Sequence, residues 1–239
     1  MALRFDSGTE WLSRTSGLIN HNGAYTVMAW ARASSFSANG VCWAALTSSS
    51  NSGGVYANAD YVGFRSGGEL QLGARKDGGG VYYAGGSYSP DTWYHIAVVR
   101  SSTTSLKAYL NGVLVLTNDS DISGRSATAS EVLGEMNNDQ PFNGRIAAFK
   151  AWGAVLTAGE IEDEMDVGPP VRSSDLIIYT PINAANLNDS LISVSGSNWT
   201  ANGAPTVEDG PPIDWGGGGG GNALLLQLMQ HGHLNGGLL

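Results

Sequence analysis

The residues Asp91-Thr-Trp-Tyr-His-Ile-Ala-Val-Val-Arg100, followed by Leu106-Lys-Ala-Tyr-Leu-Asn-Gly-Val-Leu-Val-Leu116, decide the fold of this chain. The first run has the length and the aromatic and β-branched composition of a strand, and the turn-forming pair Pro90-Asp91 introduces it. The second run is interrupted by Asn111-Gly112, a pair that tolerates the positive φ angles of a type I′ turn. The sequence therefore predicts a strand followed by a tight β-hairpin.

Further strand-like runs lie on both sides of this stretch. They cover residues 3–6, 25–32, 41–46, 61–64, 70–74, 81–83, 146–152 and 176–180. Many short strands separated by turn signals are typical of two packed antiparallel sheets, not of alternating βαβ units. The expected fold class is therefore all-β, a two-sheet sandwich.

One short helix is predicted after the strand that ends at Trp152. Thr157 and Glu160 have the spacing of a capping box, in which each side chain bonds the backbone amide of the other residue. Ile161 and Met165 then share one helical face, and the run Gly168-Pro-Pro ends the helix.

The composition bounds the class of protein. A chain of 239 residues that is 42% hydrophobic is long enough for one large domain with a substantial core. A formal charge of −9 excludes nucleic acid as a partner, because phosphate backbones require clustered Lys and Arg. The sequence holds no apolar run long enough to span a bilayer, so no membrane association is expected. Cys42, the single cysteine, follows Val41 and precedes Trp43, which favours a buried thiol.

The two ends of the chain carry further signals. The opening Met-Ala-Leu-Arg-Phe-Asp lacks the features of a secretory signal, so we expect a protein made in a cytoplasm. We assign residues 1–213 to the sandwich and 214–239 to a tail that begins with six glycines, 216–221. Residues 222–239 contain no Lys, Arg, Asp or Glu, and an apolar peptide on a glycine tether favours docking onto a partner. The predicted partner-binding residues are Leu224, Leu225, Leu226, Leu228 and Met229.

Several of these runs, in this order, resemble laminin G-like and pentraxin-like domains. Trp93-Tyr-His-Ile-Ala-Val-Val is similar to their W-x-H-(I/V)-A-x-V strand, and Leu106-Lys-Ala-Tyr-Leu-Asn-Gly is similar to their hairpin. The stretch from Gly144 to Ile161 resembles the strand and helix that follow, and 3–6, 25–31 and 176–182 match flanking strands. The resemblance covers about residues 2–210. It implies a concanavalin A-like jelly roll but does not by itself imply a function.

Catalysis is not expected. Glycosidases of this fold need two carboxylates that face each other across a cleft, usually from one strand in a Glu-x-Asp-x-x-Glu pattern. The nearest match, Glu160-Ile-Glu-Asp-Glu-Met-Asp166, falls on the predicted helix, where its side chains fan around the axis. We interpret these acids as a solvated helix surface.

The resemblance also implies a candidate calcium site. Pentraxin-like relatives take ligands from the loop after a strand that ends as Val132-Leu-Gly134 does here. Carboxylate and amide oxygens of such a loop suit Ca²⁺. An Asn- and Asp-rich turn without metal is the alternative. The candidate ligands are Glu135, Asn137, Asn138 and Asp139, with Asp60 or Asp77 as additional partners.

Two functional hypotheses follow. The first is a structural protein of a phage virion, such as an exposed capsid decoration protein, assembled with capsid proteins or with copies of itself. It rests on the absent secretory signal, the scarcity of lysine, the apolar tail and the use of such sandwiches on phage surfaces, which the resemblance implies.

The second is a calcium-dependent module that binds cell-surface glycans, carried on a virion or extracellular. Its sugar contacts would come from the tyrosine-bearing loops 53–56 and 77–83. Tyrosines in strands also pack against their neighbours, which is the alternative for these loops.

Overall fold

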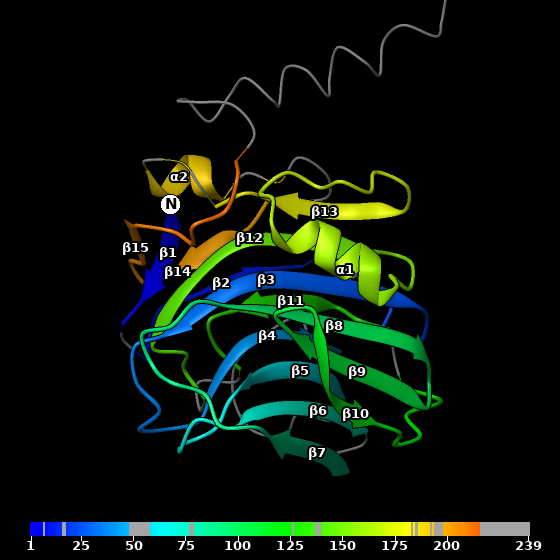
Figure 1. Ribbon diagram of the computed structural model, residues 1–239. Helices are drawn as coiled ribbons and strands as arrows, with labels where there is room; N and C mark the ends of the chain where they lie inside the picture. Colours follow the sequence, from blue (N-terminus) through cyan, green and yellow to red (C-terminus); the bar gives the residue numbers. More distant parts are fainter. Residues whose placement is uncertain are drawn as a thin grey trace, which may run out of the picture.

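The computed structural model describes residues 1–215 except 7, 16–17, 48–57, 77–78, 126, 137–139, 183, 185, 192 and 194–197 (Figure 1). Two antiparallel sheets pack face to face. Sheet 1 runs in the order β10 (Val113–Asn118), β9 (Ser105–Leu110), β8 (Tyr94–Ser102), β3 (Tyr25–Ala33), β12 (Gly144–Trp152), β1 (Ala2–Phe5), β15 (Thr206–Glu208), and β13 (Leu176–Thr180) also pairs with β12. Sheet 2 runs β14 (Thr200–Asn202), β2 (Trp11–Arg14), β11 (Ser130–Leu133), β4 (Gly40–Leu46), β5 (Ala59–Phe64), β6 (Leu70–Lys76), β7 (Gly79–Gly85).

The predicted all-β sandwich is confirmed, and its deciding hairpin forms as expected. Asn111 and Gly112 have φ angles of 49° and 79°, and Leu110 pairs with Val113 across the turn. The strands β2, β14 and β15 were not predicted. They have three or four residues each and no clear alternation, so their pairing depends on their neighbours.

The helix α1 (Ala158–Met165) covers the outer face of sheet 1 (Figure 1). The capping box is confirmed: Thr157 Oγ1 accepts a hydrogen bond from Glu160 N, and Glu160 Oε2 accepts one from Thr157 N at 2.8 Å. Ile161 is buried against Met28 and Trp152 of the sheet. A second helix, α2 (Leu187–Ser190), is one turn long. Neither described helix is long and apolar enough to cross a bilayer.

One expectation about α1 was wrong. Glu164 does not belong to a solvated surface: its side chain is buried and its Oε2 accepts a hydrogen bond from Lys150 Nζ of β12 at 2.7 Å. The same ammonium group donates to the backbone oxygens of Glu164, Val167 and Pro169. Lys150 thus fastens the end of α1 and the following turn to the sheet, with its charge balanced by one carboxylate and three carbonyls.

The segment that leads out of the sandwich packs beside this turn. Asp214 forms an isolated parallel bridge with Val167. The ring of Trp215 lies so close to Gly168 that an added Cβ there would overlap it. Asp214 and Trp215, which the sequence prediction placed in the tail, therefore contact the sandwich. Leu224, Leu225, Leu226, Leu228 and Met229 lie outside the described residues.

The space between the sheets is a continuous apolar core. It is built from alternate residues of both sheets, including Phe5, Phe64, Val98 and Phe149. Cys42 is 3% exposed, as the sequence predicts, and burial raises the pKa of its thiol. A thiol held in its neutral form is a poor nucleophile, so Cys42 acts as a small core residue.

A charged cluster interrupts this core and joins the two sheets. The carboxylate of Asp60, on β5, accepts bonds from Arg100 Nη2 at 2.6 Å and Nε at 2.9 Å, and from Arg125 Nη1 at 3.0 Å and Nη2 at 3.1 Å. Tyr25 donates its hydroxyl to the same group at 2.8 Å. Arg100 and Tyr25 belong to sheet 1, so one carboxylate of sheet 2 binds side chains of both layers. Burial acts to raise the pKa of Asp60, but the guanidinium groups of Arg100 and Arg125 outweigh it and lower that pKa.

Replacing Asp60 by Asn should lower the free energy of unfolding by about 3–5 kcal/mol at neutral pH, because two buried guanidinium groups lose their counter-charge. The folded-state pKa of Asp60 is lowered, so its stabilisation is complete above the unfolded value of about 3.9 and is lost as the pH falls through the folded pKa. Urea denaturation at several pH values should show the difference between variant and wild type narrowing in acid.

Asp91→Asn is the matched control. Asp91 is 61% exposed and pairs with Arg32 at 3.3 Å, so its loss should cost less than about 1 kcal/mol. Equal losses in the two variants would contradict the role assigned to the buried cluster.

Candidate functional site

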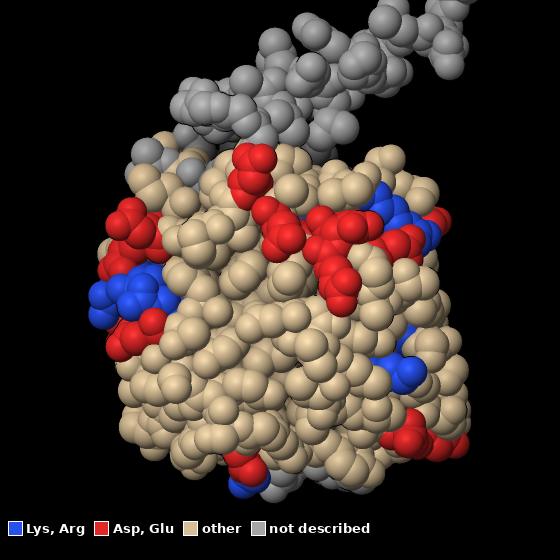
Figure 2. Space-filling model, in the orientation of Figure 1, with Lys and Arg blue, Asp and Glu red and all other residues tan. Residues whose placement is uncertain are grey.

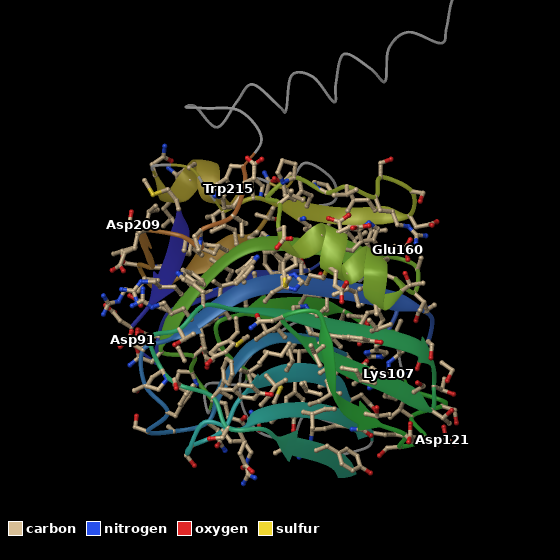
Figure 3. The ribbon with its side chains drawn as sticks, viewed as in Figure 1. Asp91, Lys107, Asp121, Glu160, Asp209 and Trp215 are labelled. Carbon is tan, nitrogen blue, oxygen red and sulfur yellow. The ribbon has the colours of Figure 1, made fainter. Side chains whose placement is uncertain are left out.

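Four connections between strands gather at one end of the sandwich, which we call the loop end. They are residues 34–39, 65–69, 86–93 and 134–143. The registers place them together, because Gly40 pairs with Phe64, Leu70 with Gly85, and Ala33 with Gly144. Figure 3 shows Asp91 at this end and Asp121 at the opposite one.

The connection 134–143 is pinned at both of its ends. Gly134 has a φ of +89° and donates its amide to Cys42 O at 3.1 Å, and Phe142 N returns to Gly134 O at 2.7 Å. Val41 N donates to Gln140 O at 3.1 Å. Met136 is buried in a second apolar cluster on sheet 2, away from the main core. The loop is thereby held across the first residues of β4.

The predicted calcium ligands lie on this loop. Glu135 is buried at its start, whereas Asn137, Asn138 and Asp139 lie outside the described residues, as does Asp77. The suggestion that Asp60 contributes a calcium ligand was wrong, because the two arginines and Tyr25 occupy its carboxylate oxygens inside the core. Among the described residues, no three His, Cys, Asp or Glu side chains are close enough together to hold a metal ion.

A small pocket of about 30 Å³ opens at the loop end. Its walls come from the connection after β3, from Phe64 at the end of β5, and from residues 141–143. Phe36, Pro141 and Phe142 form apolar walls, while Ser35, Ser37 and Asn143 supply polar groups. The pocket therefore combines apolar surface with uncharged hydrogen-bonding groups.

Glycines hold the pocket walls in place. Gly67 N donates to Phe36 O at 3.1 Å. Gly68, with a φ of +88°, lies so close that an added Cβ would come within 3.0 Å of the Phe36 ring and 2.7 Å of Tyr88 O. At Gly144 an added Cβ would lie 2.7 Å from the Phe142 ring. These close approaches require the absence of a side chain, and they fix the two phenylalanines that line the pocket.

An aromatic cluster continues from the pocket. Phe36 lies 5.2 Å from Phe64 between ring centroids, and Phe64 lies 6.2 Å and 6.1 Å from Tyr88 and Tyr94. Phe64 is buried, but the other three rings are half-buried. Burial and the neighbouring Tyr94 raise the pKa of Tyr88, which keeps its phenol neutral. Partly exposed aromatic rings beside a polar pocket are a surface on which a sugar ring can stack.

The sequence did not identify this cluster. Of the loops predicted to contact sugar, 53–56 lies outside the described residues, and in 77–83 the side chain described is Tyr83, which is 43% exposed. The paired glycines Gly67-Gly68 and Gly85-Gly86 were the available signal, because they mark turns through which other backbone and side chains approach closely.

None of the described residues that line the pocket is charged, and the charged side chains described on the loops 65–69 and 86–93 form ion pairs. Arg32 pairs with Asp91 at 3.3 Å and Arg65 with Glu69 at 3.2 Å. Acidic side chains instead gather over α1 and the upper part of the face in Figure 2, where most of the lower surface is uncharged. The uncharged lining of the pocket thus favours an uncharged ligand in the pocket itself.

Comparisons with known proteins agree with this architecture. Residues 6–162, more than half of the chain, match the family described as the concanavalin A-like lectin/glucanases superfamily. No curated protein sequence matches the chain.

Solved structures share the fold. A heptameric SAP-like pentraxin from Limulus polyphemus is 18% identical, with a TM-score of 0.53 over 67% of this chain and 79% of its own. A protein from Bacteroides ovatus to which carbohydrate binding is provisionally ascribed is 16% identical, with a TM-score of 0.64 over 88% of this chain, which spans 60% of its length. Domain 4 of the arabinanase AbnA from Geobacillus stearothermophilus is 20% identical, with a TM-score of 0.51 over 68% of this chain and 75% of that one.

Gly68→Ala should destabilise the fold more than Gly67→Ala does. Both residues have a positive φ, 88° and 97°, so each substitution costs about 1 kcal/mol in backbone strain. The added methyl group at position 68 also meets Phe36 and Tyr88 O, whereas position 67 has open space. We expect urea denaturation to show a further loss of about 1–3 kcal/mol for the first variant. Equal stability of the two would show that Gly68 does not hold the pocket wall.

Proposed function

Because this chain belongs to the concanavalin A-like lectin/glucanases superfamily, we propose that it is a glycan-binding module whose loop end holds an uncharged saccharide. The observation that carries the proposal is the pocket beside Phe36, whose lining combines serine and asparagine with phenylalanine and proline. Protein sites for sugars pair aromatic faces with a few placed hydrogen-bonding groups, and the loop end offers both. The fold relative AbnA domain 4 is described in complex with arabinotriose, which supports the same class of ligand.

The acidic residues described on the loops 65–69 and 86–93 favour binding without catalysis. Glycoside hydrolysis needs two carboxyl groups that flank the scissile bond. Asp91 and Glu69, the acids on the described loops 86–93 and 65–69, each pair with an arginine. Glu160 caps α1 and pairs with Arg172 at 2.7 Å, on the outer face of sheet 1. The proposal is therefore a lectin-like module and not a glycosidase.

We include calcium in this proposal. Glu135, Asn137, Asn138 and Asp139 would hold the ion through their side-chain oxygens, the ligands that Ca²⁺ prefers. Support comes from Glu135, a carboxylate buried at the root of the pinned loop. A bound cation there would give a rigid base to the loop that carries the pocket wall at residues 141–143.

A glycan array probed with the full chain should show binding to neutral oligosaccharides in calcium, and reduced binding in EDTA. Glu135→Gln removes one charged ligand and should weaken binding about tenfold in calcium while leaving binding in EDTA unchanged. Glu69→Gln, on the neighbouring loop, is the control and should behave as wild type. Failure to bind any glycan in either buffer would overturn the proposal. Binding that EDTA does not affect would remove calcium from it.

The apolar tail favours a second candidate function. We propose that residues 222–239 attach the sandwich to other subunits of a virion, as in an exposed decoration protein, so that the module is carried on a particle. The six-glycine tether and the five apolar residues Leu224, Leu225, Leu226, Leu228 and Met229 support this role. Burying five such side chains could contribute roughly 1.5–3 kcal/mol each before ordering costs.

Deleting residues 216–239 should leave the sandwich folded and reduce the native mass measured by light scattering from an oligomer to a monomer. Serine at the five apolar positions, with the tether intact, should have the same effect, because the apolar contacts and not the chain length drive association. A full-length protein that is already monomeric, and that does not bind particles, would contradict the assembly role.

A further inference from the structure

We propose that the pocket at the loop end is an acetamido subsite, which selects glycans that carry 2-acetamido sugars. The inference rests on the proposed glycan-binding function and names the chemical class of its ligand. It follows from three properties of the pocket: its volume, the division of its walls and the absence of charge among its described residues.

The volume suits a group of a few heavy atoms. The pocket has a volume of about 30 Å³. A single water molecule requires roughly 10–15 Å³ when volume is measured in the same way, so the pocket is larger than a water site. A pyranose ring is far too large to enter, so the pocket can receive a substituent of the sugar and not the sugar itself. An acetyl group, with three heavy atoms, is of the right size.

The walls divide into an apolar and a polar part. Phe36, Phe142 and Pro141 offer aromatic and aliphatic carbon, which suits a methyl group. Ser35 and Ser37, whose hydroxyl oxygens lie 3.3 Å apart, and Asn143 can exchange hydrogen bonds with an amide. An acetamido group presents a methyl at one end and an amide N–H and C=O at the other, and it matches both parts at once.

The competing substituents match less well. A carboxylate or sulfate would enter a pocket whose described lining holds no cation, at the cost of its hydration. A hydroxymethyl group would leave the phenylalanine walls without an apolar partner. A lone methyl group would offer the serine hydroxyls no hydrogen bond beyond the one that they share with each other.

The pocket is also preformed. Ser34 N donates to Asn143 O at 2.8 Å and Ser66 N to Asn39 Oδ1 at 2.9 Å, so the connection after β3 is bonded to both of its neighbouring loops. A binding site that is already assembled loses little entropy when its ligand enters. Its selectivity should therefore appear as a difference in affinity between otherwise identical glycans.

Calorimetric titration of the full chain with chitotriose and with cellotriose tests this directly, because the two differ in their 2-acetamido groups. We expect chitotriose to bind at least about tenfold more tightly, the factor that corresponds to about one net hydrogen bond. Ala38→Phe, at the exposed rim of the pocket, should fill it and remove this preference. Ala158→Phe, at an exposed position of α1, should retain the preference, and thermal unfolding should show that both variants are folded.

Four results would overturn the inference. Equal affinity for the two trisaccharides, or a preference that Ala38→Phe leaves intact, would show that the pocket does not read the acetamido group, while glycan binding itself would stand. Binding on an array to glycans that lack acetamido sugars, without binding to chitotriose, would have the same meaning. A protein that binds no glycan on the array would defeat the proposed function together with the subsite.

Discussion

The structure depends on the carboxylate of Asp60, the point at which the two sheets are joined by charge. Five hydrogen bonds converge on it from Tyr25, Arg100 and Arg125. Two guanidinium groups against one carboxylate leave a surplus positive charge, and backbone oxygens of Ser102, Ala59, Arg75 and His21 accept further hydrogen bonds from their Nη groups. Such a cluster is tolerable in a core only because nearly every donor finds an acceptor. Because hydrogen bonds are directional, that requirement restricts how the two sheets can shift relative to each other.

The position of this cluster in the sandwich matters for the rest of the molecule. Asp60 lies at the start of β5, Tyr25 at the start of β3, and Arg100 near the end of β8, so the charged joint is at the end opposite the loop end. The loop end is held differently, by main-chain hydrogen bonds and by glycines at 67, 68 and 144 through which aromatic rings approach the backbone. Rigidity therefore comes from buried charge at one end and from main-chain bonds and close packing at the other, where the described lining of the pocket holds no charged residue.

The sequence predicted what short-range physics determines. Asn111-Gly112 set the hairpin and Thr157 with Glu160 set the start of α1, because turn geometry and capping involve residues a few positions apart. The Asp60 cluster and the Lys150–Glu164 pair escaped prediction, since their partners are 14 to 65 residues apart and only the folded sheets bring them together. The same holds for the pocket, whose walls come from three separate parts of the chain. Glu164 illustrates this error. From the sequence alone, an acid on a short helix is expected to face solvent, and only the folded structure shows that Lys150 of β12 lies against it.

The last described residues pack against the turn that follows α1. Lys150 donates hydrogen bonds to the carbonyls of Val167 and Pro169, in the turn after α1. Asp214 pairs with Val167 of this turn, and the ring of Trp215 packs against Gly168. Trp215 therefore packs beside the turn that follows α1, and Figure 3 shows it at the top of the molecule, above Asp91. The described lining of the pocket includes neither Asp214 nor Trp215, nor the turn that holds them. The two proposed functions are compatible in one chain, because they rest on different residues, those of the pocket and those of the segment 222–239.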